Sequence, residues 1–152
     1  MHGLIPVAPL LRELKAAPPG NAYAAHLLGW LADPEALPDL IAALGSRDAN
    51  LRHATSEAIL RYGPAAGSAL QEALKHPQAE ARELAAELLR MMADAQAVPA
   101  LLAHLGDTEP SVRQAVVRAL GAAGGDAAWQ ALLQSLNDPE IAGEEEPVTV
   151  GQ

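Results

Sequence analysis

Apolar residues recur at helical spacing in two short runs between residues 97 and 124, and a turn separates the runs. The apolar positions of the first run are Val98, Leu101, Leu102 and Leu105, and those of the second are Val112, Ala115, Val116, Ala119 and Leu120. This spacing places the apolar side chains on one face of each helix. Pro99 suits the first turn of the first helix, and Gly124 suits the end of the second. Neither helix can bury its apolar face alone, so the pair needs neighbours.

The neighbours are copies of the same helix pair. A leucine pair four residues apart recurs at steps of 30 or 31 residues, as Leu10/Leu14, Leu40/Leu44, Leu70/Leu74, Leu101/Leu105 and Leu132/Leu136. The second helix opens with Arg52, Arg82 or Arg113 in three copies, and Asn21 takes that place in the first. Several columns that keep one period indicate a stacked helical repeat. We expect helices at about 4–16, 21–32, 35–45, 48–62, 66–75, 78–92 and 126–137, together with the pair in 97–124.

The repeated unit resembles the HEAT repeat, and is most similar to the short bacterial subclass first described in phycobilin lyases. The pattern is P-x-L-(x)3-L followed by V-R-x-A-(x)3-A-L-G-(x)2-G, and residues 97–124 carry it best. The resemblance implies an all-α, right-handed α-solenoid of about four helix pairs plus one extra C-terminal helix. It does not specify a function, because function depends on sites placed on a fold. We expect the solenoid to span 1–140 and an acidic flexible tail to span 141–152, with repeats at about 4–32, 35–63, 66–94 and 97–124 and a half repeat at 126–138.

The composition suits closely packed helices. Half of the 152 residues are hydrophobic, yet only 3% are aromatic, and there is no phenylalanine. The absence of cysteine excludes disulfides, thiolate metal sites and cysteine nucleophiles. The sequence has no apolar run long enough to span a membrane, and its N-terminal segment has no basic stretch ahead of the apolar part. We therefore expect a cytoplasmic, bacterial protein.

The net charge of −9 makes nucleic acid an improbable partner, because nonspecific binders neutralise phosphates with lysine and arginine. Part of the acidity lies in Glu144, Glu145 and Glu146, so a local basic stripe on the folded part stays open.

Catalytic patterns are missing from the sequence. None of the five histidines belongs to an H-E-x-x-H motif or a His-Glu dipeptide, which argues against the di-iron hydroxylases that share this fold. His53 and Glu57 lie one helical turn apart, but two ligands do not make a metal site. No phosphate-binding glycine loop and no activated serine is present. We expect no catalytic residues, no cofactor and no metal.

The second helices present an outward column of side chains at four-residue spacing. The resemblance implies that this column lines the concave, commonly binding, side of the stack. The candidate partner-binding residues are His26, Trp30, His53, Glu57, Arg61, Glu83, Glu87, Arg90, Gln114 and Arg118. The alternative interpretation is a solvated polar face that serves solubility.

Three aromatic residues receive different interpretations. Trp30 shares its position with Arg61, Met91 and Ala122, so it is either an interface anchor or a cover for the exposed end of the first repeat. Trp129 and Tyr62 share positions with apolar residues, and we expect both to pack in the core.

The repeated arginines have two interpretations. They form either an anion-binding stripe or an inter-repeat hydrogen-bonded ladder, with Asp48, Gln78 and Glu109 as the nearby side chains. We favour the ladder, which is the usual role of this arginine in the family that the repeat resembles.

The sequence predicts a non-catalytic scaffold that presents the second-helix face to a protein partner of unknown identity. Two alternatives remain: an accessory role in cofactor or chromophore attachment, and a nucleic-acid-binding module. The helix at 126–137 has no second helix to complete its repeat. Its apolar face is either satisfied by the fourth pair, or completed by a partner or by the rest of a longer solenoid.

Overall fold

The structure is a computed structural model, and it describes residues 6–136. Within this range the chain contains nine α-helices, three short 3₁₀-helices and no strand. The first helices of the pairs are α1 (Val7–Leu14), α3 (Leu37–Ala43), α5 (Gly67–Ala73) and α7 (Val98–Ala103), and the second helices are α2 (Gly20–Leu31), α4 (Ala49–Arg61), α6 (Ala79–Met92) and α8 (Pro110–Ala123). Helix α9 spans Asp126–Ser135, and the 3₁₀-helices are η1 (Pro34–Ala36), η2 (Gly63–Ala66) and η3 (Ala95–Ala97).

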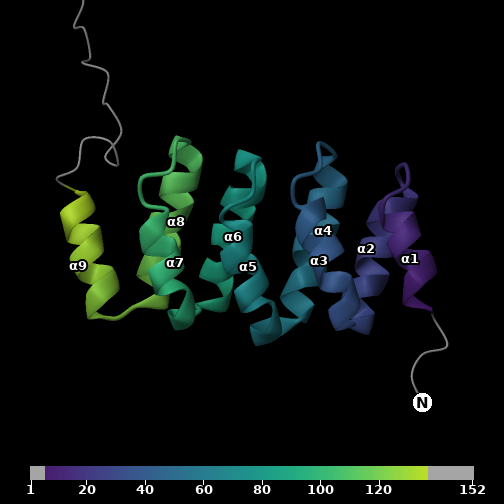
Figure 1. Cartoon of the computed structure of the whole chain (residues 1–152), viewed down its shortest axis with the longest axis horizontal. Helices are drawn as coiled ribbons and strands as arrows, with labels where there is room; N and C mark the ends of the chain where they lie inside the picture. The colour runs from purple at the N-terminus through teal and green to yellow at the C-terminus, as the bar shows by residue number, and fades with distance from the viewer. Residues whose placement is uncertain (1–5, 137–152) are drawn as a thin grey trace, which may run out of the picture.

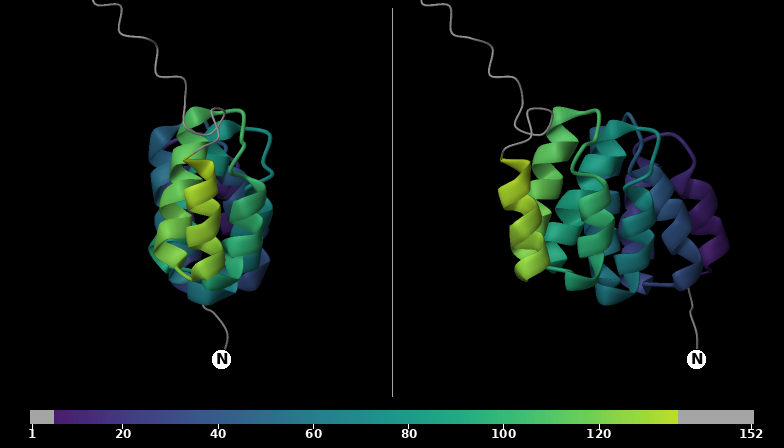
Figure 2. Two further views of the ribbon diagram at one scale, coloured as in Figure 1. Left: turned by 90° about the vertical axis from the view of Figure 1, so that its left-hand side faces the viewer. Right: turned by 60° about the vertical axis from the view of Figure 1, so that its left-hand side comes forward.

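The helix pairs stand side by side in one row that runs from α1 and α2 to α9 (Figure 1). The second helices contact one another in one layer, and the first helices form the other, as the view from the α9 end shows (Figure 2). This arrangement confirms the predicted all-α HEAT-like solenoid. The predicted helix at 35–45 is split into the 3₁₀-turn η1 and the shorter helix α3, whereas the one at 66–75 corresponds to α5, which η2 precedes. The proposed tail at 141–152 lies outside the described residues.

The core consists mainly of leucine and alanine from both layers. The repeated leucines Leu40, Leu44, Leu70 and Leu74 are fully buried. Small residues let the second helices approach closely: a Cβ added at Gly29 of α2 would lie 2.6 Å from Ala58 Cα of α4. The packing is uneven, because α2 packs closely on α4, and α6 on α8, whereas α4 and α6 approach each other less. The second-helix layer therefore consists of two closely packed halves.

The turns that follow the second helices use defined backbone conformations. Ala32 after α2 and Ala93 after α6 both adopt a left-handed conformation with φ of 48°, and Gly63 does so after α4 with φ of 57°. Asp33 and Asp94 then each accept a hydrogen bond from the backbone N–H two residues later. Such left-handed residues end a helix and redirect the chain into the next repeat.

Candidate protein-interaction surface

The ten residues predicted for the second-helix column lie on α2, α4, α6 and α8, and all of them are at least partly exposed. We call this set the second-helix column. Its side chains do not form one continuous network, because they gather into two clusters, one on each closely packed half of the layer.

The first cluster joins α2 and α4. The Arg61 guanidinium lies over the Trp30 ring, 3.8 Å from its centroid. Glu57 lies between two histidines, with 3.6 Å from its Oε2 to His26 Nδ1 and 3.4 Å from its Oε1 to His53 Nε2. Trp30 is 69% exposed even with the arginine stacked on it. The cluster therefore presents a large aromatic surface beside mixed charge.

The second cluster joins α6 and α8 and is purely polar. Glu87 accepts a hydrogen bond from Arg90 Nε at 2.8 Å, and its other oxygen lies 2.8 Å from Arg118 Nη2. Glu83 and Gln114 lie on the same face, and no side-chain bond joins them to this cluster in the part of the chain that the structure describes. No ion pair or side-chain hydrogen bond between residues 6 and 136 joins α4 to α6. Sequence reasoning placed these residues on one face but did not identify the two clusters.

The predicted inter-repeat ladder is observed at one arginine only among the described residues, and the bonding partners differ from those predicted. Each arginine donates to a backbone carbonyl six residues earlier, in the turn of its own repeat: Ser46 for Arg52, His76 for Arg82 and Asp107 for Arg113. Carbonyls at the end of a helix lack internal partners, so this bond stabilises the turn. The predicted partners Asp48, Gln78 and Glu109 do not receive these bonds.

Among the described residues, only one of the three arginines also bonds to the next repeat. Arg82 forms a bidentate pair with Asp107, at 2.8 Å from Nε to Oδ2 and 2.9 Å from Nη2 to Oδ1. Burial by itself raises the pKa of Asp107, but the hydrogen bonds and charges of Arg82, with the Glu109 N–H, outweigh it and lower that pKa. The buried Nε of Arg113 has no hydrogen-bond partner among the described residues. These arginines therefore have structural roles.

Tyr62 is buried, as predicted, and it ties two repeats together. Its hydroxyl donates to the Asp33 carbonyl oxygen at 2.8 Å. Burial and the charge of Asp33 raise the pKa of Tyr62 to about 12. The side chain therefore stays protonated and keeps its donor at neutral pH.

The prediction for Trp129 was wrong, because this side chain is 59% exposed. Leu133 and Leu136 of α9 are also exposed, whereas Leu132 packs against the core. The periodicity identifies the apolar face of α9 correctly, but no described helix covers the part that faces away from α8. Leu132 packs against the preceding pair, so only part of the apolar face is covered.

Sequence reasoning also missed an exposed apolar surface at the other end. Tyr23 and Leu27 of α2 are exposed next to Trp30. Their spacing of four and three residues places all three side chains on neighbouring turns of α2. The repeat alignment contains the signal, because the positions equivalent to Tyr23 and Leu27 hold small or apolar residues that pack on the preceding second helix. No described second helix precedes α2.

Between residues 6 and 136 there is no group of three or more His, Asp or Glu side chains that could hold a metal ion. No helix in this range is long and apolar enough to cross a membrane.

Comparison with known sequences identifies the repeat. A model of HEAT repeats matches residues 67–143, and a model of the PBS lyase HEAT-like repeat matches residues 22–46. No curated protein matches the sequence significantly.

Solved structures support the same fold. The complex of CpcE and CpcF of phycocyanin lyase from Nostoc sp. PCC7120 matches with a TM-score of 0.53 and 23% identity, over 92% of this chain and 66% of that one. An engineered protein matches with a TM-score of 0.50 and 20% identity, over 89% of this chain and 74% of that one. At these identities the likeness concerns the fold alone. The family match covers half of the sequence and agrees with the stacked helix pairs, so the chain belongs to the HEAT-repeat family.

Proposed function

We propose that this protein is a non-catalytic interaction scaffold, and that it docks a partner protein on the α2–α4 half of the second-helix column. HEAT repeats suggest such a scaffold role in general terms. The observation that carries the finer proposal is Trp30, a large aromatic side chain that is mostly exposed and held in place by the Arg61 guanidinium.

The physical argument concerns the cost of ordering side chains on binding. Tryptophan and arginine are the residues most enriched among those that dominate interface energies. A guanidinium over an aromatic face is attracted to the ring by about 0.5–1 kcal/mol at an exposed site. The stacking therefore favours one arrangement of the pair before a partner arrives, which reduces the conformational entropy lost on docking.

The surroundings of Trp30 have the composition of a small docking surface. Leu27 and Tyr23 extend the apolar area along α2. His26 and Glu57 provide a polar border on the side of α4. An apolar centre with a polar rim is the usual anatomy of a protein interface. The α6–α8 cluster has no comparable aromatic centre, so we assign it to partner orientation through charge.

The test compares two exposed tryptophans in capture experiments. Immobilised wild type, Trp30→Ala and Trp129→Ala would be incubated with lysate of the source organism, and bound proteins would be quantified by mass spectrometry. We expect one partner to be retained by wild type and by Trp129→Ala, and to be lost by Trp30→Ala. The purified partner should then bind wild type in calorimetry, and a double variant, Trp30→Ala with Arg61→Glu, should bind at least about tenfold more weakly.

Circular dichroism would first establish that each variant is folded. Equal binding of the purified partner to wild type and to the folded double variant would contradict the proposal. Equal loss in Trp30→Ala and Trp129→Ala would contradict the assignment to α2 and α4.

A second candidate function is an accessory role in chromophore attachment. The PBS lyase HEAT-like match at residues 22–46 includes His26 and Trp30, and it favours this alternative. Titration with a free bilin would test it: binding should change the visible absorption of the chromophore and quench the fluorescence of Trp30. An unchanged absorption spectrum at saturating protein would exclude this role.

A further inference from the structure

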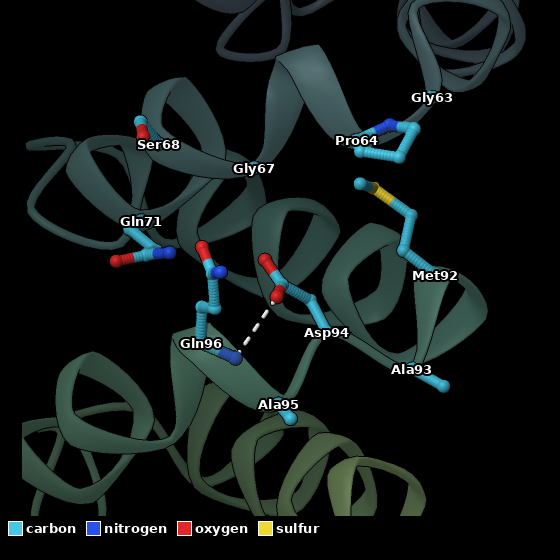
Figure 3. Close-up of a pocket in the computed structure, with 10 residues that line it drawn as sticks. All are labelled: Gly63, Pro64, Gly67, Ser68, Gln71, Met92, Ala93, Asp94, Ala95 and Gln96. Atoms are coloured by element: carbon cyan, nitrogen blue, oxygen red, sulfur yellow. Dashed lines mark hydrogen bonds between the residues drawn. The ribbon is translucent and has the colours of Figure 1, made fainter.

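A cavity of about 500 Å³ lies away from the second-helix column, between the start of α5 and the turn that joins α6 to α7 (Figure 3). Its lining includes Gly67, Ser68 and Gln71 from α5, Met92 from the end of α6, and Asp94 and Gln96 from the turn. None of the ten lining residues is basic. Cavities of this size with a few convergent polar groups are typical of ligand sites.

The cavity exists because one repeat departs from the pattern of its neighbours. Gly67 and Gln71 occupy two positions that face the following turn. The same two positions hold apolar residues in the adjacent pairs, namely Leu37 and Ile41 before and Val98 and Leu102 after. Those four side chains pack against the core. Gly67 has no side chain, and Gln71 stands where the adjacent pairs have a branched apolar side chain. This repeat therefore has a polar cavity where apolar side chains fill the space in its neighbours.

The Asp94 carboxylate extends into the space that Gly67 leaves open. Its Oδ1 accepts a hydrogen bond from the Gln96 N–H at 3.0 Å. Its Oδ2 lies 2.8 Å from where a Cβ at position 67 would stand. Within residues 6–136, no lysine, arginine or histidine forms an ion pair with this carboxylate. The side-chain amides of Gln71 and Gln96 lie toward the same space (Figure 3).

We propose that this cavity binds a guanidinium or primary ammonium group. Asp94 Oδ2 provides the charge that such a cation needs and an acceptor for its N–H donors. Met92 and Pro64 line the apolar side and suit the methylene stem of such a group. The net charge of −9 also attracts cations. This site is independent of the proposed docking surface, so either assignment can fail without the other.

The first experiment is a titration of the ¹⁵N-labelled protein, followed by NMR. The probe is arginine with both termini capped, and its matched control is capped citrulline, which has the same shape without the charge. We expect capped arginine to give saturable shifts of the Gln71 and Gln96 side-chain amides, with a dissociation constant in the millimolar range. Capped citrulline should give no saturable shift.

Two substitutions with one matched control sharpen the test. Asp94→Asn keeps an oxygen for the Gln96 N–H and removes the charge, so binding should weaken at least about tenfold. Gln71→Leu restores the apolar residue of the neighbouring repeats, and should abolish binding by filling the cavity. Asp33→Asn changes the equivalent residue of the first turn, beside Leu37, and should leave the affinity within about twofold of wild type.

The source of the cation is decided by a second probe, a linear diamine. If capped arginine binds more tightly than the diamine, the natural ligand is a side chain of a partner protein. If the diamine binds more tightly, the natural ligand is a free amine. Both results support a cation site. Equal shifts with arginine and citrulline would overturn the proposal without any variant. Equal weakening in Asp94→Asn and Asp33→Asn, or shifts confined to Glu57 and Glu87, would also overturn it.

Discussion

The same repeat position is buried in the middle of the stack and exposed at its ends. Leu88 in α6 is 2% exposed, whereas Leu27, at the equivalent position of α2, is 42% exposed. Leu74 in the turn after α5 is fully buried, whereas Leu136, its equivalent after α9, is 74% exposed. The residue type is unchanged in both comparisons. Burial in a solenoid is therefore a property of the neighbouring repeat and not of the residue.

This difference bears on function. An end of a solenoid that is not covered by another repeat usually carries polar residues. The described ends of this stack instead carry exposed apolar side chains, with a tryptophan at each end. At the α1–α2 end the tryptophan is stacked by Arg61, and at the α9 end no such pair is formed among the described residues. This contrast is the reason for placing the docking surface on α2 and α4.

The largest expected effect separates the two leucines. Leu88→Ala removes a buried side chain and leaves a cavity, so it should lower the free energy of unfolding by about 3 kcal/mol. Leu27→Ala removes an exposed side chain and should cost less than about 1 kcal/mol. Urea unfolding followed by circular dichroism measures both. Equal losses would show that a covering contact protects Leu27 in solution.

The turns before the second helices provide a second comparison, between two residues at the same repeat position. Asp107 and Ser46 each accept a side-chain hydrogen bond from the backbone N–H two residues later, but only Asp107 also pairs with the arginine of another repeat. Asp107→Ala should destabilise the protein by about 2 kcal/mol more than Ser46→Ala, since it leaves the Arg82 guanidinium partly buried and unpaired. Thermal unfolding of both variants checks this. A difference near zero would show that water replaces the carboxylate.

The pH dependence of stability should reflect the region around Asp107 and His104. Burial, with the charges of Arg82 and Lys75, lowers the pKa of His104, although Asp107 opposes the shift. The unfolded chain then takes up the proton more readily, so stability should fall as the pH decreases below about 6.5. Asp107, whose pKa is also lowered, should add a further loss below about pH 4. His104→Gln should remove the first decline and Asp107→Asn the second, in unfolding curves measured from pH 7.5 to 3. A decline near pH 6 that persists in His104→Gln would assign it to another group.

The smallest expected effect concerns the turns. Ala32→Gly should raise the free energy of unfolding by about 0.5 kcal/mol, because glycine adopts a left-handed conformation without the steric cost that alanine pays. Part of that gain is lost to the greater freedom of glycine in the unfolded chain. Ala93→Gly has the same φ and should show the same gain in thermal unfolding. Destabilisation by either change would show that the alanine methyl group makes a contact that outweighs the strain.

The sequence by itself determined the repeat, the helices and the face of each side chain. Periodicity identified the buried leucines and placed the second-helix column on one surface, because helical spacing fixes which residues share a face. It also identified the arginine position as structural. These features depend on contacts within one helix pair, or on contacts that every interior repeat makes in the same way.

The tertiary structure decided what the repeats do to one another. Arg82 pairs with Asp107 of the next repeat, whereas Arg113 Nε has no hydrogen-bond partner among the described residues. Arg61 stacks on Trp30, and Trp129 is exposed. Gly67 and Gln71, which stand where the adjacent repeats have apolar residues, line a cavity that the repeat pattern alone does not predict. The physical reason is common to all of these features. Each depends on the distance and contents of a neighbouring repeat, which a pattern within one repeat does not record.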